Sequence, residues 1–308
     1  MHVHLPIAEL SVNWVIVLVM GTGVGMLSGM FGVGGGFLIT PLLIFYGIPP
    51  AVAVATGANQ IVASSVTGVI GHWRRKAVDV RMGLVLLAGG VVGSVLGVWL
   101  FSVLRATGHI EVLISLAYVA LLGIVGTMMI TEGLSAIRAR HLGRRSRSSR
   151  RRARHNWIHG LPFKMRFKTS RLYISALLPL MLGLLVGVMA AIMGVGGGFI
   201  MVPAMIYLLR MPTNVVVGTS LFQILFVTAL VTVLHAVNNQ TVDFVLALIL
   251  LIGSVLGVQF GVGLGHKMRG EQLRALLGAI VLAVCAKLAF DLFAAPADRF
   301  TLTAAGGS

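Results

Sequence analysis

The chain has 308 residues, of which 57% are hydrophobic and 10% are charged, and its mean hydropathy is +0.99. Soluble domains are roughly a quarter charged, so this composition excludes a soluble enzyme and indicates a protein that crosses a membrane several times. The formal net charge of +16 is concentrated in one segment, and the single cysteine, Cys285, excludes an internal disulfide framework and a thiolate metal cluster.

Ten hydrophobic segments follow one another along the chain, five on each side of a basic segment. The first five are Val12–Phe31, Phe37–Ile48, Ala51–Gly71, Met82–Leu104 and Val112–Thr131. The other five are Tyr173–Met193, Phe199–Leu209, Thr213–Leu234, Phe244–Gly265 and Ala275–Ala294. A helix needs about 20 apolar residues to span the hydrocarbon core, and the second segment of each half is shorter than that. The pattern predicts an all-α polytopic membrane protein.

Short motifs recur in the same order in the two halves. Gly32–Phe37 is matched by Gly194–Phe199, and Gly93–Val98 is matched by Gly253–Val258. Ordered matches at a nearly constant offset indicate a duplication. We therefore expect a first membrane repeat in residues 1–131, a basic linker in 132–172 and a second membrane repeat in 173–308.

The linker carries thirteen of the 24 Lys and Arg residues. Short cytoplasmic loops collect such residues, so we expect the linker to be cytoplasmic. An alternative is that the basic residues of 138–171 bind anionic lipid headgroups. We do not expect nucleic-acid binding, because no predicted fold presents these arginines.

The short loops predict the relative orientation of the two halves. The loop 72–81 carries four Lys or Arg residues, whereas its equivalent in the second half, 235–243, carries none. The following loop of the second half, 266–274, carries three. Opposite charge bias is typical of repeats with inverted topology.

Three consecutive glycines interrupt a hydrophobic run in each half. Glycine is a poor helix former and admits positive φ, and irregular backbone is tolerated in a bilayer only where it is buried in protein or lines a wet cavity. Paired interruptions of this kind point to a binding site near the midplane, where backbone N–H groups at the start of a half-helix can bind an anion. The alternative is close helix crossing through small residues.

The third segment of each half is polar for its expected depth in the membrane. Amide and hydroxyl groups there could complete the shell of an anion, or they could form hydrogen bonds between helices. The expected substrate-binding residues are Gly34, Gly35, Gly36, Thr56, Asn59 and Gln60 in the first repeat and Gly196, Gly197, Gly198, Thr219, Ser220 and Gln223 in the second.

Other patterns argue for transport rather than catalysis. We find no cluster of metal ligands and no nucleophile with a nearby base, so we expect no enzyme activity, metal or cofactor. Glycine rows at a spacing of four indicate helix-packing faces, or a homo-oligomer interface. These rows are Gly89, Gly93 and Gly97, and Gly253, Gly257, Gly261 and Gly265.

Carboxylates are missing from the middle of every hydrophobic segment before the last one. In the last segment, Lys287 and Asp291 are spaced to form an ion pair toward its C-terminal end. Proton-coupled carriers usually place carboxylates deep in the membrane. An anion that leaves a negative-inside cell needs no such relay, so the pattern favours export or facilitated flow of an anion.

The duplicated motif, followed in each half by a proline (Pro41 and Pro203), resembles the sulfite exporter TauE/SafE family of bacterial membrane permeases. The stretches Ala55–Asn59 and Gly218–Leu221 add to this resemblance, which covers about residues 12 to 294 and leaves the linker outside. The resemblance implies transport of sulfite, organosulfonates or related sulfur anions across the bacterial inner membrane.

The function that we expect is therefore that of a secondary permease that exports a small sulfur oxyanion. The alternative is a membrane scaffold that transports nothing and whose basic loop recruits lipid or a partner protein.

Overall fold

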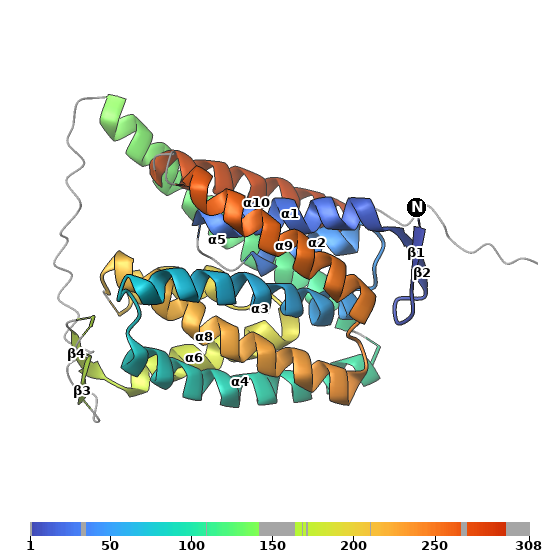
Figure 1. The fold of residues 1–308 in the computed structure, drawn as a ribbon, viewed down its shortest axis with the longest axis horizontal. Coiled ribbons are helices and arrows are strands. Elements are labelled where there is room, and N and C mark those ends of the chain that lie inside the picture. Colours follow the sequence, from blue (N-terminus) through green and yellow to red (C-terminus); the bar gives the residue numbers. More distant parts are fainter. Residues whose placement is uncertain are drawn as a thin grey trace, which may run out of the picture.

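The computed structural model describes residues 2–31, 35–108, 110–141, 164–167, 169–170, 172–209, 211–265 and 270–293 (Figure 1). The first repeat forms β1 (His2–Leu5), β2 (Leu10–Asn13), α1 (Trp14–Phe31), α2 (Gly36–Phe45), α3 (Pro50–Arg74), α4 (Val80–Ala106) and α5 (Ile110–His141). The second repeat forms β3 (Lys164–Phe167), β4 (Leu172–Ser175), α6 (Leu177–Met193), α7 (Gly198–Tyr207), α8 (Thr213–Leu234), the π-helix η2 (His235–Asn239), α9 (Phe244–Gly265) and α10 (Gly270–Phe293). Each predicted hydrophobic segment contains a helix, although Val12–Phe31 and Tyr173–Met193 begin in strands β2 and β4. The all-α polytopic architecture is confirmed.

A short hairpin that the sequence did not predict precedes the first helix of each repeat. Strand β1 pairs antiparallel with β2, and β3 pairs antiparallel with β4. The segment predicted as a linker, 132–172, therefore contains the end of α5 and strand β3. Residues 142–163, which carry most of the linker's basic side chains, lie outside the described residues.

The two repeats have opposite orientations. Figure 1 shows the β1–β2 hairpin at one end of the molecule and the β3–β4 hairpin at the other, so α1 and α6 start from opposite ends. The turn after α3 and the end of α5 lie at the β3–β4 end, and η2 lies at the β1–β2 end. This is the inverted arrangement that the loop charges predicted.

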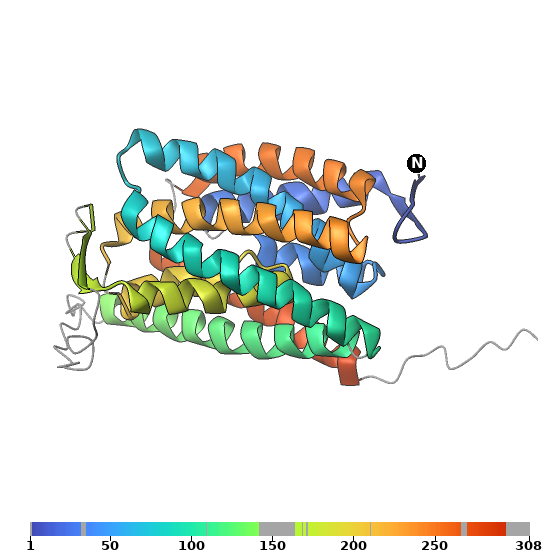
Figure 2. The same cartoon turned by 90° about the horizontal axis from the view of Figure 1, so that it is seen from below.

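Helices of one repeat pack mainly on helices of the other. The most extensive contacts join α1 to α9, α4 to α6, α5 to α10 and α3 to α8 (Figures 1 and 2). Because α1 and α6 are equivalent, as are α4 and α9, the first two pairs are related by the pseudo-two-fold symmetry of the repeats. The core is shared between the repeats, and neither half has a separate interior.

The glycine rows are helix-packing faces. A Cβ atom added at Gly89 or Gly93 of α4 would overlap the backbone carbonyls of α6, and one at Gly257 or Gly261 of α9 would overlap those of α1. Only glycine lets these backbones approach so closely. The prediction of packing faces is thus confirmed within the chain.

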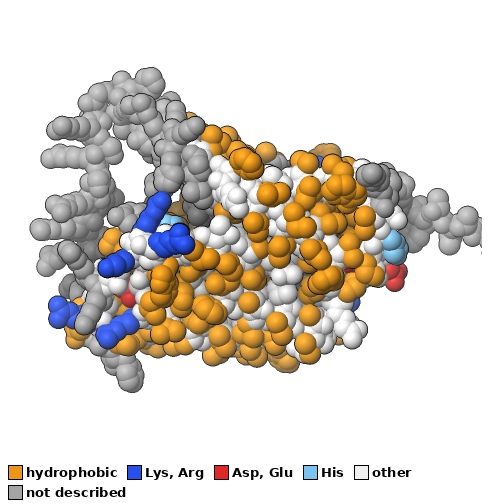
Figure 3. Space-filling model, in the orientation of Figure 1, with side chains coloured by type: hydrophobic (Ala, Val, Ile, Leu, Met, Phe, Trp, Pro, Cys, Tyr) orange, Lys and Arg blue, Asp and Glu red, His pale blue; other side chains and the backbone are white. Residues whose placement is uncertain are grey.

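The outer surface suits a bilayer. Among the described residues, five helices are long and apolar enough to cross a membrane, namely α3, α4, α5, α8 with η2, and α9. Figure 3 shows hydrophobic side chains over the helical body, with Lys and Arg gathered at the β3–β4 end. Large apolar side chains on this surface, such as Trp99, Phe244 and Phe260, are more than half exposed, as expected for lipid-facing residues.

Candidate functional site: two glycine breaks and a polar pocket

The glycine motifs separate two short helices from the helices that precede them. The first break lies between α1 and α2, where Gly35 has a φ of +68°. The second lies between α6 and α7, where Gly194, Gly196 and Gly197 have φ values of +67°, +69° and +74°. This left-handed backbone is strained for any residue with a side chain, which explains the glycines. The predicted site residue Gly34 lies outside the described residues.

The two breaks meet at the interface between the repeats. A Cβ atom on Gly36 would lie 3.1 Å from the carbonyl oxygen of Val195 in the other break. The residues that follow the breaks, Phe37 and Phe199, stack with ring centroids 4.5 Å apart and an interplanar angle of 13°. The structure therefore brings together two segments that the sequence only related by repetition.

Side chains of the protein cover the glycines in this conformation. Ile61 of α3 touches both Gly36 and Gly196, Ser28 of α1 faces Gly35, and Val186 of α6 faces Gly197. These side chains fill the space into which a side chain at each glycine would point.

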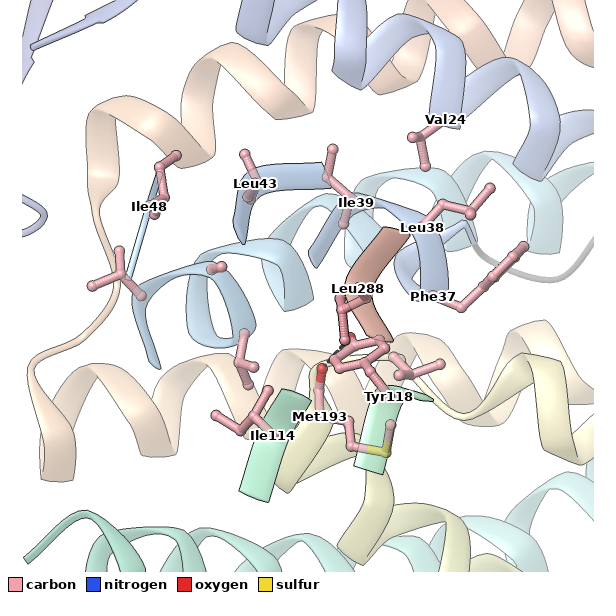
Figure 4. Close-up of a cluster of buried hydrophobic side chains, with 14 of the residues drawn as sticks. Val24, Phe37, Leu38, Ile39, Leu43, Ile48, Ile114, Tyr118, Met193 and Leu288 are labelled. Carbon is pink, nitrogen blue, oxygen red and sulfur yellow. Dashed lines mark hydrogen bonds between the residues drawn. The ribbon is translucent and has the colours of Figure 1, made fainter. Parts of the chain in front are cut away.

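The core beside the breaks holds them in place (Figure 4). Tyr118 of α5 donates its hydroxyl hydrogen to the backbone carbonyl of Met193, the last residue of α6 before the second break. Phe37, Leu38 and Ile39, which start α2, lie in the same buried cluster. A rigid scaffold therefore supports the irregular backbone.

The predicted site residues Thr56 and Thr219 connect the repeats. The hydroxyl oxygen of Thr56 accepts a hydrogen bond from the backbone N–H of Asp243 at 3.1 Å. The hydroxyl oxygen of Thr219 accepts the equivalent bond from Asp79 at 3.0 Å. Each threonine thus holds the residue that caps the fourth helix of the opposite repeat.

Asp79 and Asp243 are an important pair that the sequence analysis did not identify as functional. Both carboxylates are buried, and each caps the N-terminus of its own helix, α4 or α9. Asp79 also accepts hydrogen bonds from the backbone N–H and the hydroxyl of Ser170, and Asp243 accepts one from the backbone N–H of Ile7. The sequence contained a pattern that could have identified both residues, since an aspartate directly before an apolar run is a common N-cap.

The two glutamines are the predicted residues that best fit a ligand. Gln60 and Gln223 are 2% and 0% exposed. Among the described residues, neither polar atom of the Gln223 side chain has a hydrogen-bond partner, and the side-chain oxygen of Gln60 has none. A buried amide without partners costs about 1–3 kcal/mol, so a polar ligand would relieve this cost.

The remaining predicted residues are less distinctive. Ser220 is fully buried, and its hydroxyl donates to the carbonyl of Val217 within its own helix. Asn59 is half-buried. Gly198 starts α7 and is buried beside the second break.

A pocket of about 350 Å³ opens between α1, α3, α8 and α9. Ser28 lines this pocket and also faces Gly35, so one side chain lies between the pocket and the first glycine break. Its lining consists of Ser28, Gly29, Ser64, Thr67, Gly68, Gly71, His72, Arg75, Leu221, Val258 and Gln259. A larger groove of about 520 Å³ between α5, α6 and α7 has an entirely apolar lining, which does not suit an anion.

Helix α8 continues into the π-helix η2, which contains a buried and hydrogen-bonded histidine, whereas α3 ends at Arg74 in an exposed turn. His235 is fully buried and shares a hydrogen bond of 2.9 Å with the carbonyl of Ala191, which can only accept, so its Nε2 carries the proton. Its Nδ1 then accepts from the side-chain amide of Asn239 at 3.0 Å. Arg105 donates to the backbone carbonyl of Asn239 at 2.6 Å.

The described residues contain no group of three His, Cys, Asp or Glu side chains that could hold a metal ion. The one predicted ion pair in the last helix is present, with the ammonium of Lys287 3.2 Å from the carboxylate of Asp291, and both side chains are about half exposed.

Comparison with known proteins gives a consistent result. A probable membrane transporter protein of Bacillus subtilis, YjnA, is 30% identical over 89% of this chain and 99% of its own length. A probable membrane transporter protein of Xylella fastidiosa is 29% identical over 87% of this chain and 93% of its own. An Arabidopsis thaliana sulfite exporter TauE/SafE family protein is 45% identical, but over 17% of this chain. No solved structure matches. Residues 17–288 match the sulfite exporter TauE/SafE family, and the chain therefore belongs to that family.

Proposed function

We propose that this membrane transporter moves a small oxyanion, sulfite or an organosulfonate or a related sulfur anion, out across the bacterial cytoplasmic membrane. The observation that carries the proposal is the meeting of two glycine breaks at the interface between inverted repeats. Gln60 and Gln223 support it, because both are buried and their hydrogen-bonding capacity is not filled among the described residues. Ile61, which touches both breaks, directly follows Gln60 in α3. Inverted-repeat transporters place their binding sites between such broken helices.

Neutral hydrogen-bond donors suit an oxyanion that must be released again. The amide nitrogen of Gln223 and the backbone N–H groups at the start of α2 and α7 can donate to its oxygens without a fixed positive charge. The amide nitrogen of Gln60, which gives one hydrogen to the carbonyl of Gly21 at 3.5 Å, has a second hydrogen to donate. Each neutral hydrogen bond contributes only about 0.5–1.5 kcal/mol, so several weak bonds would select the anion without trapping it.

The hydrogen bonding of the buried carboxylates favours export of an anion over proton-coupled uptake. In the part of the chain that the structure describes, the two fully buried carboxylates, Asp79 and Asp243, both accept hydrogen bonds at helix starts. Neither is free to serve as a proton relay beside the breaks. A membrane potential that is negative inside supplies about 2.3 kcal/mol per charge per 100 mV to an anion that leaves.

The proposed topology has the linker and the β3–β4 end in the cytoplasm. The turn 74–76, with its three cations, and the β3–β4 hairpin lie at the same end of the molecule (Figure 1). Labelling of single cysteines at 74–76 from inside and at 236–241 from outside tests this orientation. Labelling of both loops from the same side would exclude it.

Flux of sulfite, sulfate, thiosulfate and sulfonates in proteoliposomes tests the function. Gln223→Ala or Asn59→Ala should weaken apparent binding by about 2- to 12-fold, the range of one neutral hydrogen bond. Thr127→Ala is a matched control, because this exposed hydroxyl bonds only to its own helix. If no oxyanion is carried by correctly folded protein, the proposal fails and the scaffold alternative gains support.

A further inference from the structure

The pocket has an equivalent position in the other repeat, and that position is closed. The alignment that pairs Gly32 with Gly194, Gln60 with Gln223 and Gly93 with Gly253 also pairs each pocket residue with a residue of the opposite repeat. Ser28, Ser64, Gly68, Leu221 and Val258 correspond to Ala190, Val227, Val231, Ala58 and Val98. These five equivalents, with Ala191, form one buried hydrophobic cluster, which we call the apolar plug.

The pocket and the apolar plug differ in residue type as well as in conformation. Along α3, the positions Gln60, Ser64, Gly68, Gly71 and Arg75 are three or four apart and so share one face of the helix. This face runs about 22 Å from a buried amide to an exposed guanidinium. Its equivalent on α8 continues from Gln223 through Val227, Val231 and Leu234, and is apolar.

The charges at the two ends also differ. Arg75 is exposed at the mouth of the pocket, beside Arg74 and Lys76, and no ion pair is recorded for it within the described ranges. The nearest acidic residue in the sequence, Asp79, is occupied by the N–H of Met82 and by Ser170. At the plug end, Arg105 is held by the carbonyl of Asn239.

Donors for an anion lie along the pocket wall. Gln259 and His72 line it, and neither side chain forms a hydrogen bond within the described part of the chain. At the inner end, next to Gly35, the Ser28 hydroxyl likewise has no partner among the described residues.

We propose that this pocket is an oxyanion-binding vestibule, in which Arg75 supplies the charge and His72, Gln259 and Ser28 supply hydrogen bonds, and that the apolar plug closes the pathway on the opposite side. The inference rests on the proposed function, because it makes the pocket the cytoplasmic approach to the glycine breaks. A cation at the mouth raises the local concentration of anions, and a dry apolar cluster is a barrier to a hydrated ion.

Charge-selective labelling of a cysteine tests the vestibule without any measurement of flux. Thr67, which lines the pocket and is half-buried, is changed to cysteine in a Cys285→Ser background. Its reaction rates with a negatively and a positively charged methanethiosulfonate are measured in the full-length protein and divided by the rates for a free thiol.

We expect Arg75→Gln to lower the ratio of negative to positive rates by about fivefold or more, since a nearby charge acts on both reagents with opposite sign. Arg74→Gln, which removes the same charge from the neighbouring residue outside the pocket lining, should change the ratio much less. Sulfate or ethanesulfonate, which do not cleave disulfides, should slow the labelling of Thr67→Cys. Equal ratios in the two arginine variants would overturn the vestibule.

A second cysteine tests the plug. Val231, the equivalent of Gly68, is fully buried in the apolar plug, so Val231→Cys should label at least tenfold more slowly than Thr67→Cys with either reagent. Equal labelling rates for Val231→Cys and Thr67→Cys would refute the proposal that the apolar plug closes the pathway.

The same measurements separate the two proposals. Oxyanion flux without charge-selective labelling would refute the vestibule and leave the proposed function in place. Charge-selective labelling in a protein that carries no oxyanion would refute the proposed function.

Discussion

The two ends of this transporter are made from copies of the same unit, yet one end contains a polar pocket and the other a packed apolar plug. At Ser28, Ser64 and Gly68 the first arrangement has hydroxyls and a missing side chain, and the second has alanine and two valines. The helix pairs around the two places are otherwise equivalent, α1 with α9 and α4 with α6. The comparison teaches that a few small side chains decide which of two equivalent places is a pocket and which is a packed cluster.

The largest effect on flux and stability is expected for a substitution in a glycine break, where the backbone has positive φ. Gly197→Val places a branched side chain at a φ of +74° and against Val186. The left-handed backbone costs roughly 1–2 kcal/mol and the overlap about 1–3 kcal/mol more. We expect flux to be abolished and the melting temperature to fall. Gly23→Ala in α1 is the control, because a Cβ there meets nothing within 4 Å and Gly23 does not line the pocket. A Gly197→Val protein with normal flux would remove the second break from the site.

The second largest effect is expected for a substitution that removes a side chain from the apolar plug. Val231→Gly deletes a fully buried side chain from the middle of α8, and such a cavity costs about 2–4 kcal/mol in addition to the poor helix propensity of glycine. We expect a lower unfolding free energy together with faster leak of small anions through proteoliposomes. If the protein is destabilised without leak, the plug is a packing element only.

Closing the pocket should have a smaller effect on stability but a clear effect on transport. Gly68→Val gives α3 the residue that α8 has at 231, and the atom nearest to a Cβ at Gly68 is the flexible end of Leu221, at 2.7 Å. We therefore expect little change in the unfolding free energy and a loss of flux of about tenfold, because the added side chain fills the pocket wall. Unchanged flux would show that the anion takes another route.

The substitution with the smallest expected effect on stability is Gln223→Leu. Whether it raises or lowers the unfolding free energy decides whether the amide is kept for a ligand. Gln223→Leu removes two polar atoms that have no partner among the described residues, so it should raise the unfolding free energy by about 1 kcal/mol while it lowers flux. Thr228→Val in the same helix removes a hydroxyl that is bonded to Ile224 and serves as the control. If Gln223→Leu destabilises the protein, the amide has a structural partner and is not kept for a ligand.

Sequence reasoning predicted the helices well because the determining signals are local. Apolar runs of about 20 residues and glycine or proline interruptions mark α3, α8 and α9 almost to the residue. The hairpins were not predicted, since strands of four residues next to long apolar runs give a weak signal.

The candidate site could be predicted only in part. Residue type identified the buried amides Gln60 and Gln223, but could not show that Thr56 and Thr219 are occupied across the repeat interface. The pocket was missed although its signal is in the sequence, because it lies in the contrast between equivalent residues such as Ser64 and Val227 and not in either residue alone.

The crossed hydrogen bonds of Asp79 and Asp243 have a consequence for how the protein can be built. Each half supplies the carboxylate that ties down the hairpin of the other half, at Ser170 and at Ile7. Each half caps its own fourth helix, but neither half can anchor its own hairpin without the carboxylate of the other. A chain divided between His141 and Lys164 should therefore reassemble when the two pieces are produced in the same cell, and each piece made by itself should be degraded.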